Sequence, residues 1–138
     1  VAEYNPLFGS ELEITVPNIK NFDRTDYHYS NLCWGVSLKG LINIMKEKNF
    51  IFLGVNSLKN NAFFINKDYQ NLFKKIILGI NSKLDKYVNH NFKESRDKRG
   101  KLTNLSSEEQ LKEIKDCQVV DIKKSLVEEV KLSELFKI

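Results

Sequence analysis

The feature of the sequence that most constrains its fold is an amphipathic helix followed almost at once by an apolar strand. Ser37 is a favourable N-cap residue, and apolar residues recur after it at helical spacing: Leu38, Leu41, Ile42 and Met45. A short polar stretch then leads into the continuous apolar run Phe50 to Val55, which is typical of a strand inside an α/β sheet. The sequence therefore predicts a helix at 37–48 that crosses over to a strand at 50–55.

Three further segments have the pattern of strands. The apolar segment 1–4 ends at Asn5-Pro6, where the proline has no amide hydrogen to continue a ladder. Apolar and polar residues alternate over 11–16, and Pro17 ends that segment. The apolar segment 62–65 follows the strand at 50–55 after a short turn, so we expect an α/β fold whose sheet is mixed, with an antiparallel strand near one edge.

The remaining chain suggests a division into three parts. We expect 1–80 to form the α/β domain, with a long polar loop at 18–34 and helical spacing at 69–80. Residues 81–105 are strongly polar and predict a linker or an exposed segment. Residues 106–138 predict a small α+β tail. Its helix begins at the capping box of Ser106 and Glu109, and a hairpin pairs the segments 118–122 and 126–130.

Charge, hydropathy and cysteine spacing exclude several classes of function. No apolar run approaches the roughly 20 residues that cross a bilayer, so we expect a cytoplasmic protein. The net charge of +4 is spread along the chain, which makes a nucleic-acid partner unlikely on pattern alone. Cys33 and Cys117 match neither a metal-ligand nor a disulfide spacing and are expected to be buried thiols. His28 and His90 have no second ligand at metal spacing, so no metal site is predicted.

Several short motifs, taken in their order, resemble one bacterial family. They are the segments 3–9 (EYNPLFG), 28–30 (HYS), 35–38 (GVSL), 54–57 (GVNS) with 61–64 (NAFF), and, in the tail, 92–97 (FKESRD), Gly100, 102–103 (LT), 105–106 (LS) and Glu109. This largely uncharacterised family resembles, in its upstream half, the S-adenosylmethionine-dependent methyltransferases of FkbM type. The present chain resembles the family's C-terminal half, and we expect it to be the C-terminal part of a larger protein.

The resemblance implies a Rossmann-like class I methyltransferase fold, with a mostly parallel sheet and one antiparallel strand near the edge. It also implies S-adenosylmethionine as the methyl donor and an oxygen or nitrogen of a small or glycan-like molecule as the acceptor. The chain departs from the family in one respect: its six glycines are isolated and form no glycine-rich turn after a strand. The cofactor-binding residues are therefore unknown, and we expect the chain alone to bind the donor poorly.

Candidate site residues follow from the end of the first strand and from the long loop. Glu3 and Asn5 stand at the carboxyl end of the predicted strand, where open α/β sheets place ligand-facing groups and where the resemblance puts the donor methyl group. The alternative for Asn5-Pro6 is a turn without a catalytic role. His28 in the long loop is a candidate general base, with exposure and local hydrogen bonding as the alternative. Tyr29, Ser30 and Asn56 are candidates for hydrogen bonding to the acceptor.

Two classes of function lead at this point, and nucleic-acid binding through a basic surface ranks third. The first is an enzyme, in which this chain supplies the acceptor side of a methyltransferase cleft and is inactive alone. The second is a non-enzymatic α/β module that serves as an interaction surface. Strand edges and apolar surface also predict self-association of the isolated chain.

Overall fold

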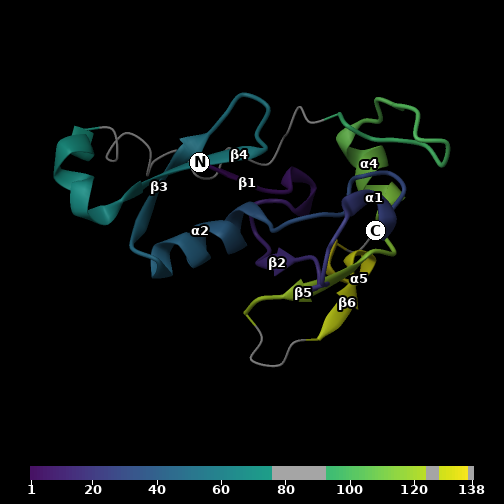
Figure 1. The fold of residues 1–138 in the computed structure, drawn as a ribbon, viewed down its shortest axis with the longest axis horizontal. Coiled ribbons are helices and arrows are strands. Elements are labelled where there is room, and N and C mark those ends of the chain that lie inside the picture. The colour runs from purple at the N-terminus through teal and green to yellow at the C-terminus, as the bar shows by residue number, and fades with distance from the viewer. Residues whose placement is uncertain (76–92, 124–127, 137–138) are drawn as a thin grey trace.

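The fold is described from a computed structural model, which covers residues 1–75, 93–123 and 128–136. It is an α/β fold with two three-stranded sheets, which occupy the two halves of the molecule in Figure 1. The strands are β1 (Ala2–Glu3), β2 (Ile14–Thr15), β3 (Phe50–Val55), β4 (Asn61–Asn66), β5 (Gln118–Asp121) and β6 (Glu129–Lys131). The α-helices are α1 (Arg24–Tyr27), α2 (Leu38–Glu47), α4 (Ser107–Glu113) and α5 (Leu132–Phe136), and two 3-10 helices are η1 (Pro6–Phe8) and η2 (Lys67–Phe73).

The first sheet has the strand order β1-β4-β3 and carries α2 against it. As predicted, Ser37 caps α2, since its hydroxyl accepts a hydrogen bond from the Gly40 amide at 3.2 Å. Leu38 and Leu41 on the buried face of α2 pack with Phe52 and Ala62 of β3 and β4 and with Tyr4, which directly follows β1. The helix at 37–48 and the strand at 50–55 are therefore confirmed.

The second sheet has the order β2-β5-β6 and unites the two ends of the chain. Ile14 pairs with Asp121 in an antiparallel ladder between β2 and β5. The core behind this sheet joins the early residues Phe8 and Leu32 to Ile114 and Leu132. The segment 106–138, expected as a separate tail, thus shares both a sheet and a core with residues 7–34.

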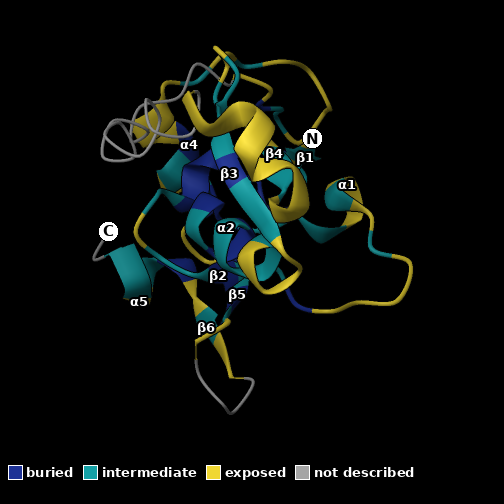
Figure 2. Ribbon diagram, turned by 90° about the vertical axis from the view of Figure 1, so that its left-hand side faces the viewer, coloured by how far each residue is buried: buried dark blue, intermediate teal, exposed yellow. Residues whose placement is uncertain are grey.

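Ser37 is the link between the two halves. Besides capping α2, its hydroxyl donates to the Leu12 carbonyl at 2.7 Å and accepts from the Ile14 amide at 3.1 Å. The Ser37 amide donates to the Ile14 carbonyl at 2.8 Å. The start of α2 is thereby held against β2, and Figure 2 shows the buried residues gathered in the middle of the molecule with β6 projecting outward.

The prediction of a mixed, mostly parallel sheet has to be corrected. Among the described residues every pair of neighbouring strands is antiparallel, because the polar turn after Val55 returns the chain directly beside β3 as β4. The strand predicted at 11–16 is shorter, and the loop predicted at 18–34 contains α1, which begins where the Asp23 carboxylate accepts from two amides.

The other predictions of local structure are either confirmed or fall partly outside the described residues. The capping box that opens α4 is confirmed, and so is the antiparallel hairpin of β5 and β6. The helical segment predicted at 69–80 begins as the 3-10 helix η2, and its last residues, 76–80, lie outside the described residues. Residues 81–92 of the predicted linker and residues 126–127 of the predicted hairpin also lie outside them.

Candidate functional site

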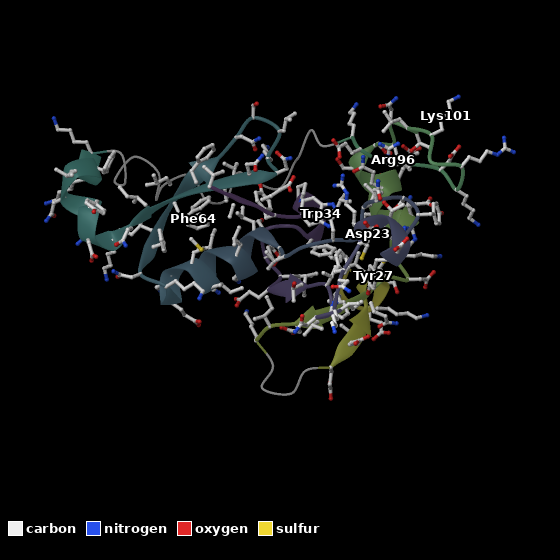
Figure 3. All side chains as sticks on the ribbon, viewed as in Figure 1. Asp23, Tyr27, Trp34, Phe64, Arg96 and Lys101 are labelled. Atoms are coloured by element: carbon white, nitrogen blue, oxygen red, sulfur yellow. The ribbon has the colours of Figure 1, made fainter. Side chains whose placement is uncertain are left out.

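The carboxyl end of β1 opens into a cavity of about 580 Å³, which we call the strand-end cavity. Its lining combines charged and aromatic side chains: Glu3, Asp23, Arg24, Trp34 and Glu94. Glu3 is exposed at the end of β1, as the sequence predicts. Trp34 and Asp23 both line this cavity, and Figure 3 labels them to the right of Phe64.

Helix α1 places two of the charged groups in this cavity. The Asp23 carboxylate accepts hydrogen bonds from the Thr25 and Asp26 amides at 2.7 and 3.1 Å. These bonds hold the pKa of Asp23 below its usual value, because they stabilise the ionised form. Arg24 forms an ion pair with Glu94 at 3.6 Å, which brings the segment after residue 92 to the rim of the cavity. One cation and three carboxylates therefore line the cavity.

Asn5 has a structural position. It is fully buried, and its side-chain amide donates to the carbonyls of Leu32 and Trp34 at 2.8 and 2.9 Å. Its side-chain oxygen accepts from the Leu7 amide at 3.0 Å. The whole amide group is thus used to hold the 32–34 segment against η1, which matches the alternative of a turn rather than direct contact with an acceptor. Asn5 positions Trp34 instead of reaching the cavity itself.

Asn56 lies in the turn between β3 and β4. Its side-chain oxygen accepts from the amides of Asn60 and Asn61 at 3.0 and 3.1 Å, and its amide donates to the Asn60 side chain at 2.9 Å. The Asn60 carbonyl accepts from the Tyr4 amide at 2.9 Å, so this turn lies beside the end of β1. The structure brings Asn56 and Glu3 to the same end of the first sheet, although Asn56 serves the turn.

His28, Tyr29 and Ser30 form a separate cluster at the other end of α1. His28 Nδ1 lies 2.7 Å from Ser30 Oγ, and Ser30 is fully buried. The Tyr29 hydroxyl donates to Glu113, its ring stacks on His28, and Lys98 lies over the ring at 5.6 Å. Burial lowers the pKa of His28, against the opposing effect of Glu113, so the imidazole is neutral at neutral pH.

The predicted site residues therefore fall into two places. Glu3 lies in the strand-end cavity, whereas the lining of that cavity does not include His28, Tyr29 or Ser30. Asp23 was not among the predicted site residues, although an aspartate three residues before the next acid is a common N-terminal helix signal. Trp34, which was not among the predicted site residues, is buried and also lines the cavity. Glu94 carries no local signal, because its place depends on its partner Arg24.

A second cavity of about 560 Å³ adjoins the first, and we call it the apolar groove. Its apolar lining comes from β2, β5 and the segments that follow them: Val16, Ile19, Val120 and Ile122. Phe22 and Gly35 line both cavities. The candidate site is therefore a charged cavity and an apolar groove that meet at these two residues.

Within the described residues, no helix is long and apolar enough to cross a membrane, and no three His, Cys, Asp or Glu side chains are grouped to hold a metal ion. Comparison of the chain with protein-family models, with curated proteins and with solved structures gave no match. The candidate site consequently stands on the geometry of this chain alone.

Proposed function

We propose that this chain is part of an S-adenosylmethionine-dependent methyltransferase and supplies the acceptor side of its cleft. The acceptor would present an oxygen or a nitrogen of a small or glycan-like molecule. The observation that carries the proposal is the position of Glu3, an exposed carboxylate at the end of β1 and inside a cavity. Ligand sites of open α/β sheets lie at such strand ends.

The topology of the first sheet supports the same proposal. Strand β4 is antiparallel to both of its neighbours, so β1 and β3 run in the same direction on either side of it. Helix α2 lies between β1 and β3 in the sequence and packs against β3. The family resemblance implies an antiparallel strand near the sheet edge, and β4 occupies such a place, next to the edge strand β3.

The described residues do not fit the methyl donor itself. Strand β1 is followed by the 3-10 helix η1 and β2 by Val16 and Pro17, so neither leads through a glycine-rich turn into a helix. We therefore assign this chain only acceptor contacts. Glu3 would hold an acceptor hydroxyl or amine by a charge-assisted hydrogen bond and accept its proton. Trp34 forms part of the lining of the same cavity.

The test is a methyl-transfer assay on the full-length protein that contains this chain, with methyl-labelled S-adenosylmethionine and a panel of aryl-alkyl amines and simple glycosides. Glu3→Gln keeps the shape of the side chain but removes the base, and the expected loss of rate is about 100-fold. Glu11→Gln, at an exposed residue outside the cavity, is the matched control. Full activity of the Glu3→Gln protein would remove Glu3 from the mechanism.

A non-enzymatic interaction module is the second candidate, and one observation favours it. Tyr69 and Leu72 in η2 are 59% and 78% exposed, and exposed apolar side chains close together are typical of interaction surfaces. On this proposal the isolated chain associates with itself through η2. Sedimentation of the chain and of a Leu72→Ser variant would test it, and a monomer in both cases would count against the module.

A further inference from the structure

The strand-end cavity and the apolar groove meet at a glycine. Gly35 has a φ of +65°, and apart from Gly35 and its two chain neighbours no residue has an atom within 4 Å of the place where a Cβ would stand. Gly35 and Phe22 line both cavities, so the bare backbone of Gly35 leaves open space where they meet. One ligand of modest size can therefore extend from the end of β1 onto the groove.

The charges around this double cavity favour a cation. Glu3, Asp23 and Glu94 line the strand-end cavity, and Asp121 lines the groove. Arg24 is the cation in the two linings, and its guanidinium lies 3.6 Å from Glu94. Because Arg24 pairs with Glu94, the other carboxylates leave an excess of negative charge. A carboxylate beside aromatic side chains such as Phe22 and Trp34 is a favourable place for an ammonium group.

The groove offers the other half of the ligand an apolar surface. Ile19 and Ile122 are 43% and 36% exposed, which places two large apolar side chains at the mouth of the same groove. Val16 and Val120 extend this surface along β2 and β5. A small apolar group laid on it would remove these side chains from water, and that burial is favourable.

We propose that the two cavities together bind an amine with an apolar body. The ammonium group lies at Glu3, and the apolar body crosses Gly35 onto the groove at Ile19. The role of this amine as the methyl acceptor rests on the proposed function, whereas its binding does not.

The experiment uses the only tryptophan, Trp34, as a fluorescent reporter in the cavity wall. The 138-residue chain is titrated with 2-phenylethylamine, for which a dissociation constant on the order of 1 mM is expected. Three analogues separate the two halves of the ligand: 2-phenylethanol lacks the charge, 3-phenylpropionate reverses it and methylamine lacks the apolar body. Each is expected to bind at least about threefold more weakly, which is the effect of losing one exposed ion pair or apolar contact.

Two variants with matched controls locate the site. Glu3→Gln and Ile19→Ser are each expected to weaken binding of 2-phenylethylamine about three- to fivefold. Glu11→Gln and Leu72→Ser, which alter an exposed acid and an exposed leucine elsewhere, should leave it unchanged. Unaltered melting temperatures would show that the variants are folded, as expected for exposed positions.

Equal binding of the alcohol or the carboxylate would overturn the proposal, and so would the absence of any response of Trp34 to the amine. Loss of binding in both control variants would also overturn it. Binding of the amine by this chain, together with failure of the full-length protein to bind S-adenosylmethionine, would end the proposed function while the amine site stands.

Discussion

The buried amide of Asn5 gives the strongest single prediction about stability. Its three hydrogen bonds satisfy two carbonyls and one amide in the segments around Leu7, Leu32 and Trp34. Asn5→Ala leaves all three groups without this partner inside the protein. An unsatisfied buried group costs about 1 to 3 kcal/mol, so with partial relaxation we expect a loss of about 3 to 5 kcal/mol in the free energy of unfolding.

Asn5→Asp distinguishes the effect of the hydrogen bonds from that of side-chain volume, because it changes the hydrogen bonds but keeps the volume. The carboxylate can still accept from the Leu7 amide, but it faces the two carbonyl oxygens that the Asn5 amide now serves. Burial among acceptors raises the pKa of the new carboxyl group above about 3.9. The free energy of unfolding of the Asn5→Asp variant should therefore fall as the pH rises above about 3.9, because the buried carboxyl group must then lose its proton. The loss of stability in Asn5→Ala should not depend on pH.

Urea unfolding followed by far-UV circular dichroism is the suitable assay, because Trp34 fluorescence would respond locally to the lost hydrogen bond at its carbonyl. Asn18→Ala, at an exposed asparagine, is the control and should change the free energy of unfolding by less than about 0.5 kcal/mol. A decrease of less than about 1 kcal/mol in the free energy of unfolding of Asn5→Ala would refute the reasoning. Asn5 would then again be a candidate for contact with the acceptor.

Three further predictions concern helix caps, pH and thiols. Ser106→Ala removes an exposed cap and should cost about 1 kcal/mol, whereas Ser37→Ala removes a buried cap with two more hydrogen bonds and should cost clearly more in the same urea assay. Equal losses would contradict the linking role of Ser37. Glu13 lies 3.2 and 3.8 Å from two lysines; burial raises its pKa, but hydrogen bonds and these charges outweigh burial and lower it below 4.5. Its stabilisation should be present at neutral pH and lost progressively as the pH falls below about 4.5, so Glu13→Gln and the wild type should unfold at different urea concentrations at pH 7, and this difference should shrink as the pH is lowered. Both thiols are buried, and a hydrogen bond to Cys117 together with burial raises the pKa of Cys33. Burial should therefore make both thiols react slowly with an aromatic disulfide reagent until urea is added; rapid reaction of the native chain would show that this core is open.

The local elements were predictable because their signals are local. The spacing of Leu38, Leu41 and Met45 fixes the buried face of α2, and Ser106 with Glu109 marks the start of α4. The hairpin of β3 and β4 follows from two apolar runs around a polar turn. Each of these depends on residues within about 16 positions of one another, so the sequence alone contains the information.

The long-range pairings were not predictable in the same way. The contact of β2 with β5 joins Ile14 to Asp121, and nothing in either segment identifies the other. The two-residue strand β1 gains its place through Tyr4 and the Asn60 carbonyl, a contact that depends on the completed hairpin. Glu3 was recognisable as a strand end because the proline that follows it is a local signal. Glu94 has no such signal, because it joins the cavity through the ion pair with Arg24, which is distant in the sequence.

The most direct test of the central claim is calorimetric titration of S-adenosylmethionine into the longer protein that the methyltransferase account proposes and, in parallel, into this chain. The methyltransferase account predicts binding by the longer protein and none by the chain, because the described residues include no site for the donor. Absence of binding to both would contradict that account and would favour the interaction module.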